Sequence, residues 1–364
     1  MELRYYIIRR LLIFIPTLIG LLLIVFILMH SLPVRYLTGP YVTGRTPAQR
    51  ALEYAQAVQA LGLNYPLPVQ FLDFIRNIFT GNWGYMSAGG GYTGSVLALV
   101  DTYFPNTVQL AVFAIILAFV ISIPLGTYIG ARPNSMADQV GRVFSLIFYA
   151  LPGFLFAIIL LVIFGKNTIG GLPWQVFPLS GVYPSSVTTN VPSWFHLSQA
   201  TGDISYPTHI FVLDALLNGD PAAAWGGFLH LVLPSIALAL GALAGILRFL
   251  RAGMVDAANQ EYVKTARAKG VPEDIVIKRH IRKNALIPTV TVLGLLFSGL
   301  LSGVVLIERV FSYQGIGLLA YYSVYPSLQV YGIADTALIF GLLLVFANLI
   351  VDVVYALIDP RIRY

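Results

Sequence analysis

The sequence predicts an all-α integral membrane protein with six transmembrane helices, and three observations support this. Of the 364 residues, 57% are hydrophobic and 10% are charged, whereas charged residues make up about 25% of an ordinary soluble domain. The mean hydropathy is +0.79. Six separate stretches each approach the roughly 20 apolar residues that a helix needs to cross a bilayer.

The predicted spans follow one another along the whole chain. They are Leu11–Leu32, Val108–Ile129, Val143–Phe164, Phe228–Leu247, Thr289–Ile307 and Thr336–Leu357. The first follows Arg9 and Arg10. Its apolar run is longer than the roughly 7 to 15 residues of a signal peptide, and no small-residue cleavage site follows it. We therefore expect an uncleaved first span.

The basic residues predict the orientation in a cell (plasma or inner) membrane. An even number of spans places both termini on one side, and Lys and Arg mark the cytosolic side. They gather near the termini and in residues 248–288, a segment that holds nine of the 22 Lys and Arg residues. Both termini and this segment, hereafter the arm, are predicted to be cytosolic. Basic residues placed beside spans do not favour a nucleic-acid partner.

Three regions follow from this topology. Residues 1–32 form the cytosolic N-terminus and first span, residues 33–104 an extracytoplasmic segment with short helices, and residues 105–364 a core with five spans. Thr46, followed by Pro and by Gln49, predicts the capped start of one outer helix, and a second should follow Pro68. The core includes an outer loop at 165–227, which is rich in Pro, Ser, Thr and Gly and is predicted to be mostly ordered loop.

The arm is predicted to contain two short helices with a sharp bend. Helical signals continue beyond the fourth span through Asp256 and Lys264 and stop at Gly270, which suits a left-handed C-cap. A second helix should start at Pro272 and end near Lys283. The small residues Ala266, Ala268 and Gly270 predict a tip that can lie close against a partner.

A plain basic loop that only orients the protein is the alternative interpretation of the arm. Its length of some forty residues and its two capped helices favour a docking element.

Two motifs in the arm carry a family resemblance. Glu261-Tyr-Val-Lys-Thr-Ala-Arg-Ala-Lys-Gly270 and Asn284-Ala-Leu-Ile-Pro288 resemble the ATPase-docking loop of the permease subunits of ATP-binding-cassette importers, in the dipeptide, oligopeptide and nickel branch. The resemblance covers essentially the whole chain, through Gly81-Asn-Trp-Gly-Tyr85 to Phe311-Ser-Tyr-Gln-Gly-Ile-Gly317. Gln314 replaces the usual Pro of the branch, and the outer loop is longer than usual.

The resemblance implies a type I importer-permease bundle that translocates peptides, or a related solute such as oligosaccharides or nickel, by alternating access. It implies a second homologous permease subunit, two cytosolic ATPase subunits that bind ATP and Mg, and an extracytoplasmic substrate-binding protein. The residues that it assigns to ATPase coupling are Glu261, Lys264, Thr265, Ala266, Arg267, Ala268, Lys269, Gly270, Arg279, Asn284 and Pro288.

No chemistry of its own is expected in this chain. There is no Gly-x-x-x-x-Gly-Lys-Ser/Thr phosphate loop, no His-Glu-x-x-His pattern and no Gly-x-Ser-x-Gly elbow, so we predict no catalytic residue, metal site or cofactor. Substrate-binding residues are not identified by spacing. The alternatives are a self-sufficient secondary transporter or channel, which calls for polar residues at mid-span and broken helices, and a membrane-embedded enzyme.

Two further features concern the spans. Gly241 with Gly245, and Gly299 with Gly303, have the spacing that allows close helix packing, within the chain or with a partner. Pro152 and Pro234 lie within predicted spans, where they can kink a helix.

Overall fold

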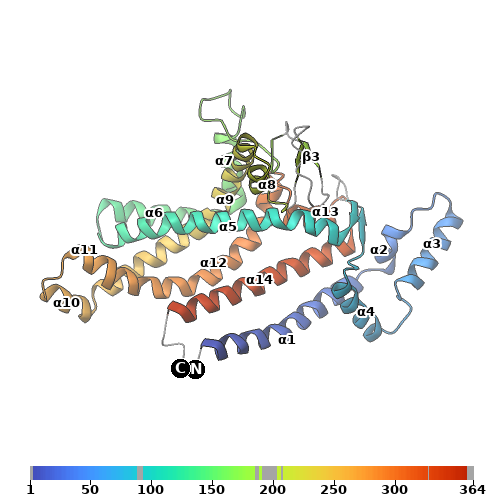
Figure 1. The fold of residues 1–364 in the computed structure, drawn as a ribbon, viewed down its shortest axis with the longest axis horizontal. Coiled ribbons are helices and arrows are strands. Elements are labelled where there is room, and N and C mark those ends of the chain that lie inside the picture. The colour runs from blue at the N-terminus through green and yellow to red at the C-terminus, as the bar shows by residue number, and fades with distance from the viewer. Residues whose placement is uncertain are drawn as a thin grey trace. The chain divides into compact units, whose positions relative to one another are not determined.

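The computed structural model describes residues 3–87, 93–184, 188–190, 203–205, 208–326 and 328–358. The chain forms two compact units. Unit 1 comprises residues 1–7, 108–313 and 346–364, and unit 2 comprises residues 8–107 and 314–345. Most of the described chain is helical, as predicted, with two short strand pairs added (Figure 1).

Three helices begin in one unit and end in the other. They are α1 (Leu3–His30), α5 (Val96–Gly130) and α14 (Val330–Ile358). The other helices of unit 1 are α6 (Met136–Ala150), α7 (Gly153–Phe164), α8 (Phe211–Leu217), α9 (Pro221–Ala258), α10 (Glu261–Ala268), α11 (Glu273–Ile275) and α12 (Arg282–Val310), with a π-helical turn, η2, at Val276–Ile281. Strands β3 (Thr188–Asn190) and β4 (Asp203–Ser205) pair in parallel.

Unit 2 contains the short helices that the sequence predicted between residues 33 and 104. Its remaining elements are α2 (Val34–Thr38), the 3₁₀ turn η1 (Gly39–Tyr41), α3 (Pro47–Ala60), α4 (Leu67–Thr80), the antiparallel strands β1 (Tyr85–Ser87) and β2 (Thr93–Ser95), and α13 (Ile316–Val324). The capping box is confirmed, because the Thr46 side chain accepts from the Gln49 N–H and the Gln49 side chain accepts from the Thr46 N–H. The helix predicted after Pro68 is also confirmed, although it begins at Leu67, one residue before this proline.

Among the residues that the structure describes, four single helices are long and apolar enough to cross a membrane. They are α1 over Leu12–His30, α5, α9 and α14 over Val330–Ile350, which confirms four of the predicted spans. The predicted span Thr289–Ile307 lies within α12. The count of six spans and the cytosolic side of the termini stay predictions.

The third predicted span, Val143–Phe164, is a bent pair of helices that together are long and apolar enough to cross a membrane. The chain forms α6 and α7, which meet at an angle of 107°. Pro152 has no N–H to donate and excludes helical geometry from the residue before it, and Leu151 accordingly adopts extended angles (φ −74°, ψ 124°). The predicted kink at Pro152 is confirmed, whereas α9 continues through Pro234.

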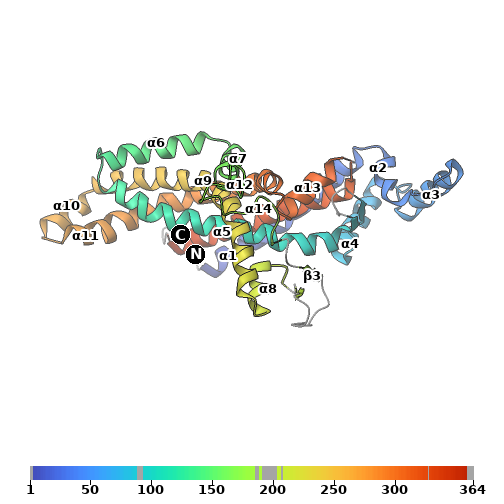
Figure 2. The same ribbon diagram turned by 90° about the horizontal axis from the view of Figure 1, so that it is seen from above.

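Helix α9 is the centre of unit 1. It packs along α12, α6 and α7, and Figures 1 and 2 both show α9 and α12 running side by side toward α10 and α11. Glycines permit the closest approaches: a Cβ on Gly130 would lie 2.6 Å from the Met254 side chain, and one on Gly253 would lie 3.0 Å from the Ala285 carbonyl oxygen. The helices that lead into and out of the arm therefore pack backbone against backbone.

Candidate coupling site

The arm folds as a bent pair of short helices between the ends of α9 and α12 (Figure 1). The sequence predicted one helix from α9 to Gly270, and this is wrong. Helix α9 ends at Ala258, Gln260 is extended (ψ 149°), and α10 begins at Glu261. Asn259 causes a break of this kind, because its side chain donates to the Val255 carbonyl at 3.0 Å and replaces a helical bond there.

The second half of the arm also differs from its prediction. The helix does begin after Pro272, with Glu273 and Asp274 in its first turn. It does not end near Lys283, because η2 continues without a break into α12 at Arg282. The second half of the arm is therefore a direct extension of α12. Its π-helical turn is an uncommon feature that often marks functional sites.

The turn at Gly270 has the predicted left-handed geometry. Its φ is 73°, and the Val271 N–H donates to the Ala266 carbonyl at 3.2 Å, which is the 6→1 bond of a Schellman cap. A Cβ on Gly270 would meet nothing within 4 Å. The glycine is therefore required by the backbone conformation and not by crowding.

A small apolar core holds the arm to the ends of α9 and α12. Its buried members are Leu250, Met254, Ala257, Val263, Ala266, Val276, Ile281 and Ala285. The predicted surface position of Ala266 is wrong, because this side chain is 7% exposed and faces the core. Ala268 and Gly270 are exposed, as predicted. The α10 face that carries Ala266 packs inward, so only the opposite face is open to a partner.

Side-chain bonds tie the remaining predicted residues together. The Tyr262 side chain hydrogen-bonds the Asn284 side chain, which links α10 to α12, while burial raises the pKa of Tyr262. Asn284 also donates to the His280 carbonyl at 2.6 Å. Thr265 donates to the Glu261 carbonyl at 3.0 Å. Pro288 lies inside α12, and its side chain is outside the described part.

Three of the four acids of the arm, Glu261, Glu273 and Asp274, are paired within it. Arg267 donates from two nitrogens to the two Glu273 oxygens, at 2.7 and 3.1 Å, and this guanidinium lowers the pKa of the Glu273 carboxyl. Lys264 contacts Glu261 at 2.7 Å. Lys278 Nζ lies 3.8 Å from Asp274 Oδ2, four residues earlier.

Besides Arg248 at the base of the arm, three exposed bases form no ion pair with any residue that the structure describes. They are Lys269, Arg279 and Lys283. Because three of the four acids of the arm are already paired, its outer surface keeps a positive charge. Such a surface suits an acidic partner.

A buried ion pair fixes the base of the arm. Arg251 of α9 donates to both oxygens of Asp138, Nε to Oδ1 at 2.7 Å and Nη2 to Oδ2 at 2.8 Å. The Asn134 N–H donates to the same carboxylate at 2.9 Å. Asp138 has no exposed side-chain surface, and Arg251 has 22%. The pair joins the start of α6 to α9.

Sequence patterns did not identify Asp138 as a site residue. It lies three positions after Ser135, whose hydroxyl accepts from the Asp138 N–H as a helix cap. An acid in the first turn of a helix is favourable in itself, so its presence there does not indicate a second partner. Its partner is 113 residues away, and only the packing of α6 on α9 reveals the pair.

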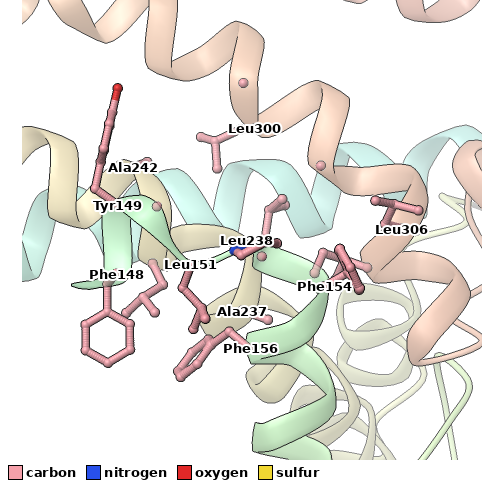
Figure 3. Close-up of a pocket in the computed structure, with 17 residues that line it drawn as sticks. Phe148, Tyr149, Leu151, Phe154, Phe156, Ala237, Leu238, Ala242, Leu300 and Leu306 are labelled. Carbon is pink, nitrogen blue, oxygen red and sulfur yellow. The ribbon is translucent and has the colours of Figure 1, made fainter. Parts of the chain in front are cut away.

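An open pocket of about 520 Å³ lies at the bend between α6 and α7. Figure 3 shows Tyr149, Leu151 and Phe154 at the bend, and Leu238 of α9 and Leu300 of α12 also line the pocket. Three of the spaced glycines, Gly241, Gly299 and Gly303, line it, and a Cβ on Gly241 or Gly299 would meet nothing within 4 Å. These two positions do not pack against another described helix, and they leave an open surface instead.

Comparison with known proteins agrees with this architecture. The family described as binding-protein-dependent transport system inner membrane component matches residues 122–364, and the N-terminal model for such membrane components matches residues 3–111.

Curated relatives match over their full length. The oligopeptide transport system permease protein AppB of Bacillus subtilis is 32% identical, with 99% of each chain covered. The dipeptide transport system permease protein DppB of Alkalihalophilus pseudofirmus is also 32% identical, with 99% of each covered. The glutathione transport system permease protein GsiC of Pectobacterium atrosepticum is 31% identical over 99% of each.

These matches confirm the resemblance seen in the arm motifs. The chain belongs to the inner membrane components of binding-protein-dependent transport systems, as a permease subunit of the dipeptide and oligopeptide branch of ATP-binding-cassette importers.

Proposed function

We propose that this permease translocates peptides by alternating access and that its arm receives the force generated by two separate ATPase subunits. The observation that carries the proposal is the continuity of the arm with the helices that line the pocket. One side of the arm leads from α9 across a two-residue break, and the other continues directly into α12. Both helices supply walls of the pocket at the α6–α7 bend.

Helix geometry explains how force could travel from the arm to the pocket. Seventeen residues separate Gly241 from the end of α9 at Ala258, which is about 25 Å at about 1.5 Å per residue. A helix packed along its length moves as a rigid element. A displacement of the arm core would therefore shift the pocket walls of α9 and α12 together.

The energetic requirement is that ATP binding favours one state of the transporter. A shift from a 1:99 to a 99:1 population requires about 5.5 kcal/mol of differential affinity. We assign the transfer of this bias to the coupling residues Glu261 to Gly270, supported by Arg279, Asn284 and Pro288. ATP and Mg would be bound by the ATPase subunits.

The other expected partners follow from the family. A second homologous permease would complete the path, and an extracytoplasmic binding protein would deliver the substrate. Peptides are the proposed substrate because the relatives carry the names oligopeptide, dipeptide and glutathione transport permeases. The bend between α6 and α7 is a broken helix of the kind that a secondary transporter also uses, so the dependence on ATP needs a direct test.

The unpaired bases of the arm supply that test. In the proposal they contact acidic groups of the ATPase, so the triple change Lys269→Gln, Arg279→Gln and Lys283→Gln should reduce capture of the coexpressed ATPase at least tenfold. An interface charge pair contributes on the order of 1.5 kcal/mol or more. The matched control removes three exposed bases from the predicted outer side: Arg45→Gln, Arg76→Gln and Lys166→Gln.

Two measurements complete the experiment. ATP-dependent peptide uptake into proteoliposomes should fall with ATPase capture in the arm variant and stay at the unchanged level in the control. Equal ATPase capture by both variants would show that the charged arm surface does not dock the ATPase. Uptake by the lone chain without ATP would contradict the importer mechanism itself.

A further inference from the structure

A second open pocket lies where α6 packs on α9, next to the base of the arm. Its volume is about 330 Å³, and its lining combines Arg142, Arg248 and Arg251 with apolar side chains that include Leu146 and Leu247. A pocket that joins guanidinium groups to an apolar wall at the end of a span has the composition of a lipid headgroup site.

The charges in this pocket are unbalanced. Asp138 is the one acid that forms an ion pair with these arginines in the described part of the chain. Arg251 holds both of its oxygens, and Arg142 lies 3.7 Å from one of them with 49% of its side chain exposed. Arg248 is exposed and stands 6.0 Å from the Tyr149 ring centre. Two of the three guanidinium groups thus share one carboxylate, and Arg248 forms no ion pair with a described acid.

The position of the pocket along α9 indicates the source of the anion that would balance its arginines. The apolar stretch Phe228–Leu247 of α9 has 20 residues, which span about 30 Å, the thickness of a hydrocarbon core. Arg248 follows directly, so the arginines reach the level of the phosphate groups of one leaflet. The pocket size falls within the roughly 300 to 1,000 Å³ of small-molecule sites.

We propose that this pocket binds the phosphate of an anionic phospholipid headgroup, with the acyl chains along the apolar wall of α6 and α9. Arginine suits this ligand because its planar fork donates two hydrogen bonds to one phosphate. Asp138 holds Arg251 by Nε and Nη2, which leaves Nη1 of that group for the lipid. The bound lipid would brace α6 against α9 at the base of the arm.

The test measures lipid retention by the full chain in its assembled complex. The complex is exchanged into nanodiscs with graded fractions of phosphatidylglycerol in phosphatidylcholine, and bound lipid is quantified by native mass spectrometry. One basic residue near an anionic surface contributes about fivefold in affinity. The variant Arg142→Gln/Arg248→Gln should therefore bind phosphatidylglycerol roughly thirtyfold more weakly, whereas Arg142→Lys/Arg248→Lys should retain most of the binding.

The control removes the same charge outside the pocket. Arg132→Gln/Arg282→Gln lies on the same predicted side of the membrane, touches neither this pocket nor the proposed ATPase-docking bases, and should keep the affinity of the unchanged chain. Equal loss in the control and pocket variants would indicate only a diffuse surface potential and would overturn the proposal. Unchanged binding in the pocket variant would overturn it too.

Free phosphate is the remaining comparison. Inorganic phosphate at millimolar concentration should not displace the lipid, because it lacks the apolar contacts, and displacement would show an anion site instead of a lipid site. The experiment reports lipid binding and not uptake. A chain that retains phosphatidylglycerol but imports no peptide would contradict the proposed function and leave this inference intact.

Discussion

The ion pair between Asp138 and Arg251 should be the most sensitive single contact at the base of the arm. Asp138→Asn keeps the shape of the side chain and removes its charge, so Arg251 loses its partner while only 22% of its side chain is exposed. Removing one partner of a buried pair costs about 3 to 5 kcal/mol. Because Arg251 retains some access to water, we expect the lower end, about 3 kcal/mol.

The loss can be read from thermal unfolding in detergent by intrinsic tryptophan fluorescence. For a chain of this size about 1 kcal/mol lowers Tm by about 2 °C, so Asp138→Asn should lower the apparent Tm by about 6 °C. Asp274→Asn is the matched control, because it removes the same group from an exposed pair at 3.8 Å. An exposed pair contributes at most about 0.5 kcal/mol on a helix, so its Tm should change by about 1 °C or less.

A double variant distinguishes the attraction within the pair from the cost of leaving one buried charge without a partner. Asp138→Leu/Arg251→Met removes both charges and leaves apolar side chains of similar length, which is often neutral for a buried pair. Its Tm should therefore lie above that of Asp138→Asn. Equal and small shifts for Asp138→Asn and Asp274→Asn would refute the argument, as would a double variant less stable than Asp138→Asn.

Two further predictions concern the turn and the core of the arm. Gly270→Ala places a Cβ where nothing lies within 4 Å, but at a φ of 73°, so backbone strain alone should cost about 1 to 2 kcal/mol. It should therefore reduce coupled peptide uptake more than Gly270→Asn does. Equal uptake by the two variants would count against this. Ala266→Leu overfills the arm core, where Ala266 is 7% exposed, so it should cost about 1 to 3 kcal/mol, lower the Tm and reduce uptake while ATP hydrolysis persists. Ala268→Leu on the exposed face should leave the Tm unchanged. An unchanged Tm in Ala266→Leu would place Ala266 at the surface and contradict this.

Local signals in the sequence were enough to predict much of this protein. Apolar runs predicted the helices that span, because a bilayer demands a fixed length of apolar helix. Thr46 with Gln49 predicted a capping box, Pro152 a break, and Gly270 a left-handed turn. Each of these is decided within a few residues by hydrogen-bonding capacity or by allowed backbone angles, so no knowledge of the tertiary structure was needed.

Tertiary structure decided what the local signals left open. The inward face of Ala266 depends on a core assembled from α9, α10, η2 and α12, and the role of Asp138 depends on a residue 113 positions away. Short-range patterns carry no information about such contacts, since burial is a property of the whole packed unit. The sequence determined that a helical, basic arm joins two spans, whereas only packing determined which of its small and charged residues remain open to a partner.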